Sequence, residues 1–197
     1  MIRYVRSTRA GHSGHRSRRL WPLVLMALVP LVSGCGILGG LSATRLSSPA
    51  SLTVTSPVFG SDVALPAVYT CHGAGLSPPL QWSGATTQTA KSFAIVVDDS
   101  QAPITPYVYW IVFDISPTTV AIGQNQLPTG ALQALNSAGK ASYQAPCPER
   151  ASHAYRFTVY ALNAVIKLHN GAGLRVAWSA IARHVIASGR LTARAKA

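Results

Sequence analysis

The 197-residue chain lacks the short motifs that mark the most common enzyme and cofactor sites. It has no G-x-S-x-G, no Gly-rich phosphate loop followed by Lys and Ser or Thr, no H-E-x-x-H and no C-x-x-C. These absences remove the usual support for a serine hydrolase, a P-loop enzyme, a zinc protease or a thioredoxin-like oxidoreductase. We therefore expect a protein that is not an enzyme and that uses no cofactor or metal.

Acidic residues are also scarce, with five Asp and Glu against 17 Lys and Arg. Such an excess often indicates a nucleic-acid or anionic-membrane partner. Six of the basic residues lie in the first nineteen positions, however, and the others are scattered without a run or interleaved aromatics. We therefore expect no nucleic-acid partner, but a solvated basic surface that favours anionic lipid headgroups.

Long hydrophobic runs are missing as well. The segment LWPLVLMALVPLV, residues 20–32, is too short for a membrane span but suits the core of a signal peptide after an arginine-rich start. The residues VSGC that end at Cys35 resemble the lipobox of bacterial lipoproteins, in which the cysteine is lipidated. An ordinary signal peptide with an unrelated Cys35 is the alternative.

These features predict an exported protein, anchored through Cys35 at the outer side of the cytoplasmic membrane. The segment SRRLW, residues 17–21, weakly resembles a twin-arginine signal, and the export route stays open. We expect three segments: a signal peptide over 1–34, the lipidated cysteine and a flexible tether over 35–50, and one domain over 51–197.

Strand patterns dominate this domain. Segments rich in β-branched and aromatic residues, or with alternating polarity, predict strands over 51–59, 91–100, 107–115 and 154–162. Apolar residues at spacings of three and four predict one helix through Leu174, Trp178, Ile181 and Val185. We expect this helix to stop at Gly189. Because strands and helices do not alternate, the fold class is mainly antiparallel β with one or two peripheral helices.

The stretch VYTCHGAGLSPPLQW, residues 68–82, could serve as a metal site, a redox centre or a pocket wall. In an oxidising compartment Cys71 and Cys147 could form a disulfide, but their positions do not show that they meet, and two separately buried thiols are the alternative. A metal held by His72, His153 and Asp99 is disfavoured, because no local ligand spacing joins them. We therefore favour a pocket wall.

Several segments, taken in order, resemble the phosphatidylethanolamine-binding protein family in its bacterial form. YTCHGAGLSPPLQWSG, KSFAIVVDDSQAP and YVYWIVFDI correspond to the family's Y-T-C-D-G…S-P-P-L-x-W-x-G, K-S-F-A-L-x-V-D-D-P-D-A-P and W-V-H-W-V-V-Y-N-I blocks. APCPERASHAYRFTVYAL resembles the G-P-C-P…H-R-Y block, and SAIARHVIASGRLTA the C-terminal helix and last strand. The resemblance covers about residues 51–193. It implies a large antiparallel sheet packed on a smaller one, with a shallow pocket for phosphate-type anions such as phospholipid headgroups.

The resemblance also implies which residues form the pocket. Asp99 matches the first acid of D-P-D-A-P, His153 and Tyr155 match the first and last residues of H-R-Y, and Pro146 and Pro148 fall in a proline-rich wall. This chain departs from the family pattern at His72, Ser100, Gln101, Tyr109 and Ala154. Tyr109 replaces a histidine but can still donate a hydrogen bond, and His72 replaces an acid and adds a donor.

The leading hypothesis is a membrane-tethered binding protein that holds an anionic small molecule through His153, Tyr155, Tyr109 and His72, with Asp99 orienting the donors. A protease inhibitor or another envelope protein-interaction module with a degenerate pocket is the second hypothesis; it would dock a protein partner through the long loops over 116–153. A hydrolase that uses His153 with Asp99 is a distant third.

Overall fold

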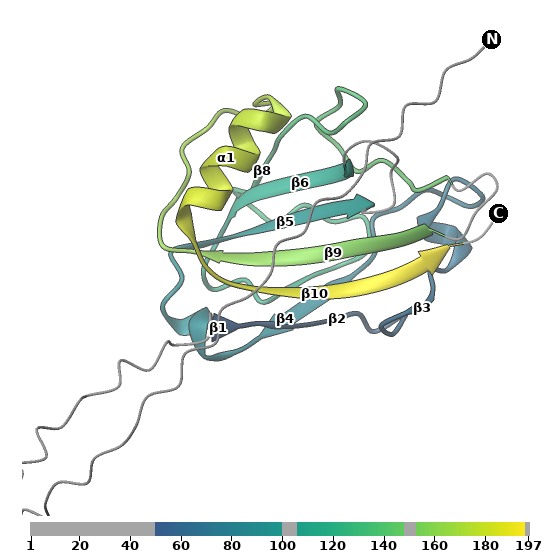
Figure 1. Ribbon diagram of the computed structural model, residues 1–197, viewed down its shortest axis with the longest axis horizontal. Helices are drawn as coiled ribbons and strands as arrows, with labels where there is room; N and C mark the ends of the chain where they lie inside the picture. The colour runs from purple at the N-terminus through teal and green to yellow at the C-terminus, as the bar shows by residue number, and fades with distance from the viewer. Residues whose placement is uncertain (1–49, 100–105, 148–152, 196–197) are drawn as a thin grey trace, which may run out of the picture. The chain divides into compact units, whose positions relative to one another are not determined.

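The computed structural model describes residues 50–99, 106–147 and 153–195 (Figure 1). The predictions for the signal peptide, for Cys35, for all but the last residue of the tether and for Ser100, Gln101 and Pro148 lie outside these residues.

The larger of two sheets contains the strands predicted over 91–100, 107–115 and 154–162, whereas the strand predicted over 51–59 is divided into two short strands, one in each sheet. Its main path runs β1 (Ala50–Ser51), β10 (Val185–Ala195), β9 (His153–Leu162), β5 (Ser92–Asp99), β6 (Tyr107–Ile115) and β8 (Leu132–Gln133). The short β3 (Val63–Ala64) also pairs with β10. All pairs are antiparallel except those that β1 and β3 make with β10, which are parallel.

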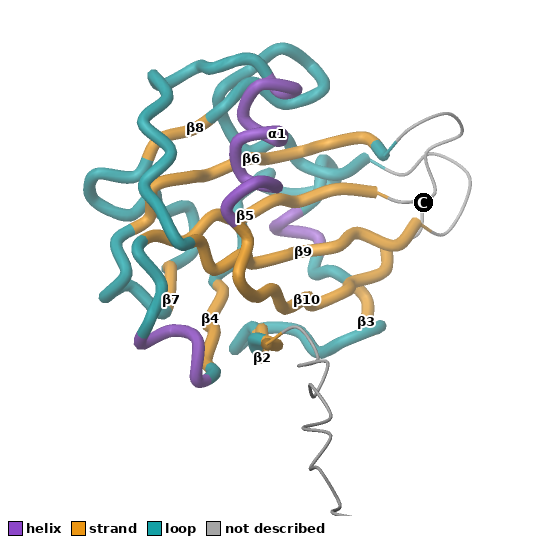
Figure 2. The backbone as a smooth tube through the Cα atoms, turned by 60° about the vertical axis from the view of Figure 1, so that its left-hand side comes forward, coloured by secondary structure: helices purple, strands orange, loops and turns teal. Residues whose placement is uncertain are grey.

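The smaller sheet is antiparallel and packs on one face of the larger one (Figure 2). It contains β2 (Thr53–Thr55), β4 (Leu80–Ser83) and β7 (Ala121–Ile122). Two short 3₁₀ helices, η1 (Ala67–Tyr69) and η2 (Ala85–Gln88), flank β4 in the chain.

The single α-helix of the described residues, α1 (Leu174–His184), covers the opposite face of the large sheet (Figure 1). The expected stop at Gly189 is wrong, because the helix ends at His184 and β10 begins at Val185. Gly189 lies inside β10, where a Cβ atom would overlap the carbonyl oxygen of Leu52. The glycine therefore permits a close backbone approach and does not cap a helix. Within the described ranges, no helix has the length and apolar character needed to cross a membrane.

Alternation along the central strands creates two cores. Tyr155, Phe157 and Val159 of β9 are buried in the core between the two sheets. Tyr160 of β9 packs against a second, smaller core that Ala177 and Ile181 of α1 form with the large sheet. Each large apolar side chain buried in this way contributes roughly 1.5–3 kcal/mol to folding. The three layers therefore give the large sheet two differently covered faces.

Candidate functional site

The two adjacent acids at the end of β5 lie on opposite faces of the large sheet. Asp98 is paired in register with Arg156, and Asp99 with Tyr155. Successive side chains of a strand point to opposite faces, and directly paired residues share a face. Asp99 therefore lies on the side of the small sheet, and Asp98 on the side of α1.

A β-bulge in β6 directs a further aromatic residue toward Asp99. Asp98 pairs with Val108, but Val97 pairs with Trp110, so Tyr109 is the extra residue of the bulged strand. Bulges commonly redirect a side chain next to a functional site. Tyr109 and Trp110 consequently both contact the core between the sheets, and the ring of Tyr109 meets that of Tyr155 edge to face at a centroid distance of 5.4 Å.

The imidazole of His153 completes a group that we call the Asp99 cluster: Asp99, Tyr109, His153 and Tyr155. His153 Nδ1 lies 2.6 Å from Asp99 Oδ2, so Nδ1–H donates to the carboxylate. The Asp99 side chain is 2% exposed, whereas that of His153 is 29% exposed. The ring of His153 also stacks on Tyr155 at 6.0 Å. The buried carboxylate therefore fixes the orientation of a half-buried imidazole.

The two tyrosines of the cluster stay neutral at ordinary pH. Burial, and then the charge of Asp99, raises the pKa of Tyr109 to about 12. Burial is also the main reason for a raised pKa at Tyr155, followed by the effects of Tyr109 and Asp99. The Asp99 cluster thus combines one carboxylate, one imidazole and two neutral phenols.

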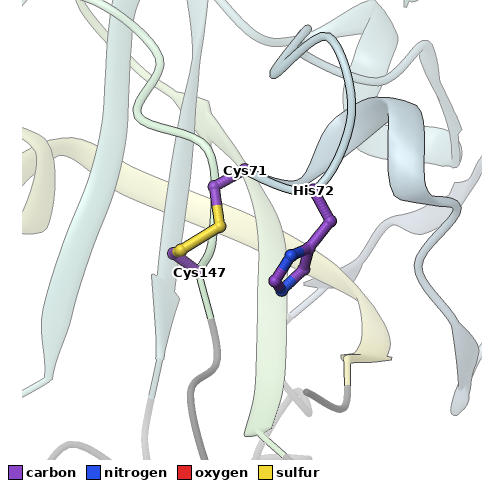
Figure 3. A group of neighbouring side chains, drawn as sticks. All are labelled: Cys71, His72 and Cys147. Atoms are coloured by element: carbon purple, nitrogen blue, oxygen red, sulfur yellow. A yellow bond between two sulfur atoms is a disulfide. The ribbon is translucent and has the colours of Figure 1, made fainter.

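Pro146 lies in a segment that a disulfide ties to the stretch 68–82. The structure joins Cys71 to Cys147, a pairing that the sequence left open (Figure 3). Pro146 is buried, and its carbonyl oxygen accepts a hydrogen bond from the amide of Cys71 at 2.9 Å. The Tyr143 hydroxyl donates to the carbonyl oxygen of Tyr69 at 3.0 Å. The segment before Cys147 is therefore held against the same core as Tyr155.

His72 is placed at a different cavity. This exposed residue, together with Asp62, Thr70 and Arg194, lines a cavity of about 560 Å³ that contains no member of the Asp99 cluster. Among the described residues, no hydrogen bond or ring contact links His72 to that cluster. The structure thus assembles four of the predicted ligand residues and sets His72 apart.

His72 also lies next to the disulfide, with its nitrogen and the two sulfurs of Cys71 and Cys147 within 4.8 Å of one another (Figure 3). Sulfur binds metal as a thiolate. Because the two sulfurs are bonded to each other, this trio is not a ligand set in the structure.

Sequence reasoning missed an ion pair on the α1 side of the sheet. Arg156 Nε and one terminal nitrogen donate to the two carboxylate oxygens of Asp98, both at 2.6 Å. These hydrogen bonds are the main reason for the raised pKa of Arg156. Alternation along β9 places Arg156 on the face opposite Tyr155, but only the register between β5 and β9 reveals its partner.

Comparison with known proteins gives the family. Residues 55–196 match the family model described as Phosphatidylethanolamine-binding protein. An archaeal relative, a UPF0098 protein of Methanothermobacter thermautotrophicus, is 34% identical over 145 residues, which is 71% of this chain and 95% of the relative. The chain belongs to the phosphatidylethanolamine-binding protein family, as the sequence blocks predicted.

A second relative and a solved structure agree with this assignment. A Mycobacterium tuberculosis protein named "Putative lipoprotein LppC" is 37% identical over 183 residues, covering 84% of this chain and 90% of that protein. The crystal structure of Escherichia coli YbcL, a member of the same family, superposes with a TM-score of 0.70 at 28% identity, over 75% of this chain and 99% of that one. The two-sheet fold predicted from the resemblance is thereby confirmed.

Proposed function

We propose that the protein is a membrane-tethered binding protein whose Asp99 cluster takes a phosphate-type anion, such as a phospholipid headgroup or another phosphorylated small molecule. The observation that carries the proposal is the 2.6 Å contact between His153 Nδ1 and the buried Asp99 carboxylate. Binding to these groups requires no covalent step.

The hydrogen bond to Asp99 prepares His153 for a ligand. With Nδ1 committed to the carboxylate, the protonated ring has its second donor, Nε2–H, for an anion. Within the described ranges Nε2 has no hydrogen-bond partner, and the side chain is partly exposed. When the ring is protonated, its charge attracts a phosphate more strongly than a neutral ring does.

Tyr109 supplies a second, uncharged donor. The hydroxyl group of Tyr109 can donate its hydrogen to a ligand oxygen. The raised pKa of about 12 keeps this hydrogen in place throughout the physiological range. An imidazolium and a phenol together suit a phosphate oxygen without requiring an arginine.

Membrane attachment is proposed from the N-terminal sequence that resembles a lipoprotein signal peptide. The residues VSGC place Cys35 where a lipoprotein carries its lipidated cysteine, and the mycobacterial relative carries lipoprotein in its name. We propose that Cys35 anchors the family domain at the outer side of the cytoplasmic membrane.

Calorimetric titration of the purified protein with phosphoethanolamine and with inorganic phosphate tests the binding proposal. The informative variant is His153→Asn, whose amide can still donate to Asp99 while the second ring nitrogen is lost. We expect saturable binding by the unmodified protein and a loss of at least roughly tenfold in the variant, about 1.4 kcal/mol.

His169→Asn is the matched control, because His169 is exposed and, among the described residues, only its backbone oxygen makes a hydrogen bond. It should bind as the unmodified protein does. Equal affinities for the unmodified protein and His153→Asn, or no binding by a protein that unfolds cooperatively, would refute the proposal. The search would then turn to a protein partner.

A further inference from the structure

A second cavity lies on the opposite face of the large sheet, between the sheet and α1. We call it the α1 cavity. Its volume is about 520 Å³, and its lining includes residues of β5, β6, β9, β10 and α1. Small-molecule sites commonly have volumes of roughly 300–1,000 Å³. No member of the Asp99 cluster lines the α1 cavity, because those residues face the other side of the same strands.

The floor and one wall of the α1 cavity are apolar or aromatic. Val96 and Ile111 lie opposite each other on β5 and β6 and are at most 3% exposed. The rings of Tyr160 and Trp178 meet edge to face at 5.7 Å, and Trp178 is 42% exposed. A large aromatic side chain open to solvent beside a cavity is well placed to cover an apolar ligand.

The charges around the α1 cavity are predominantly positive. Arg156, Arg175 and Arg190 line it, with Asp98 as the single acid of the lining. Asp98 is already engaged by Arg156 in two hydrogen bonds, and so neutralises one guanidinium. Arg175 and Arg190 therefore have no acidic partner among the described residues that line the cavity.

The two remaining arginines have donors to offer. Arg190 uses Nε to bond the Thr158 hydroxyl at 3.1 Å, and no partner for its two terminal nitrogens is found among the described residues. Arg175 has no hydrogen bond or ion pair within the described ranges, and it lies in the first turn of α1, which contains no acid. A cation at this end adds to the positive end of the helix dipole and strengthens the attraction for an anion.

We propose that the α1 cavity is a second ligand site, which binds amphiphilic organic anions. The apolar or aromatic part of the ligand lies against the partly exposed Val108 and Trp178, above the buried floor formed by Val96 and Ile111. Its phosphate, sulfate or carboxylate group is bound by Arg175 and Arg190. A guanidinium presents two parallel N–H groups to such an oxyanion, and this geometry favours bidentate binding.

Octyl phosphate is the test ligand, because it has both an apolar chain and a phosphate. The purified protein, labelled with ¹⁵N at its tryptophans, is titrated while the indole N–H signals are followed by NMR. We expect the signal of Trp178, assigned through Trp178→Phe, to shift with saturation. The signals of Trp82 and Trp110 should stay fixed, because these residues are 3% exposed and lie in the core between the sheets.

The double variant Arg175→Gln/Arg190→Gln should weaken octyl phosphate binding at Trp178 by at least roughly tenfold. Arg183→Gln is the matched control on the same helix, because Arg183 does not line the cavity and, in the described part of the chain, its side chain donates only to the Ser179 carbonyl oxygen. Octanol and inorganic phosphate, which each carry half of the ligand chemistry, should shift the Trp178 signal far less than octyl phosphate does.

His153→Asn separates this site from the Asp99 cluster and should leave the Trp178 response unchanged. Shifts that are the same in the unmodified protein and the double arginine variant, or that disappear in His153→Asn, would overturn the proposal. So would an unmoved Trp178 signal at millimolar octyl phosphate in a folded protein.

Two sources can provide this chemistry, a membrane lipid or a soluble amphiphile. Dihexanoyl phosphatidic acid carries the same headgroup charge on two chains. If it shifts the Trp178 signal in an arginine-dependent way, as octyl phosphate does, the ligand class includes diacyl lipids. If only octyl phosphate does so, the α1 cavity is restricted to single-chain amphiphiles.

Discussion

Asp98 and Asp99 are neighbours in the chain, but they lie in two different chemical environments. Asp99 is 2% exposed and bound to an imidazole, among tyrosines of the core between the sheets. Asp98 and its partner Arg156 are 18% and 21% exposed, at the edge of a cavity covered by a helix. The comparison shows how a single strand end, by alternation alone, can place one acid on each face of a sheet, in two different environments.

The two faces also differ in how they are closed. On the Asp99 face, the disulfide and the Tyr143 hydrogen bond hold the segment that contains Pro146. On the Asp98 face, α1 covers the sheet through Ala177 and Ile181, and no disulfide within the described ranges joins it to a strand. A substitution that disturbs the segment covering one face of the sheet should therefore leave the proposed site on the other face intact.

The largest expected effect comes from Cys71→Ser/Cys147→Ser. The disulfide links residues 76 positions apart, and its removal should cost about 2–5 kcal/mol of unfolding free energy. Urea unfolding measures this loss as a lowered midpoint. Phosphoethanolamine binding should weaken with it, whereas the Trp178 response to octyl phosphate should persist. An unchanged midpoint would show that the disulfide does not stabilise the fold.

The paired variants Asp99→Asn and Asp98→Asn should lower the unfolding free energy less than loss of the disulfide does, and by unequal amounts. Asp99→Asn leaves buried groups with poorer partners and should cost about 2 kcal/mol. Asp98→Asn alters a partly exposed ion pair and should cost about 1 kcal/mol or less. Thermal unfolding should show the larger drop for Asp99→Asn, roughly 3 °C per kcal/mol for a domain of this size.

The same pair should have different effects on binding. Asp98→Asn removes the single acid from the lining of the α1 cavity, so octyl phosphate affinity should rise several-fold. Asp99→Asn should weaken phosphoethanolamine binding and leave the Trp178 response unchanged. Equal losses of stability in the two variants would contradict the assignment of the two acids to separate sites. So would the opposite pattern of binding, in which Asp99→Asn alters octyl phosphate binding and Asp98→Asn alters phosphoethanolamine binding.

The smallest effect concerns alkaline pH. The pKa of Tyr109, raised to about 12, exceeds the ordinary value of 10, so its contribution to stability is complete below pH 10 and is lost as pH rises toward 12. Burial raises the pKa of Tyr160 on the other face, but nearby Arg190 lowers it in part. Tyr160 should therefore ionise before Tyr109, which ring ¹³C chemical shifts can follow. Tyr109→Phe should flatten the decline of stability above pH 10, and the reverse order of ionisation would contradict this account.

Much of the Asp99 cluster could be predicted because its signals are local. The strands 91–100, 107–115 and 154–162 carry strong β patterns, and family blocks in the same segments point to Asp99, Tyr109, His153 and Tyr155. The cluster forms because these residues come from neighbouring strands and lie near their ends. The prediction for Tyr109 came from the family resemblance; the bulge that places this residue depends on strand pairing, and no local pattern reveals the bulge.

The remaining features depend on long-range geometry. The pair Asp98–Arg156, the α1 cavity and the meeting of Cys71 with Cys147 all require a register or a fold-back that spans dozens of residues. The error at Gly189 has the same origin. A glycine after an amphipathic helix resembles a cap, but this one is required by the backbone of Leu52, which lies far away in the sequence.

The position of β10 constrains the order in which the described strands can pair. β1, β3 and β9 all pair with β10, which follows them in the sequence. Ala50 and Ser51 therefore gain their strand partner only when β10 docks. Until then β9 has one unpaired edge, and deletion of residues 185–195 would leave that edge open to association with other chains.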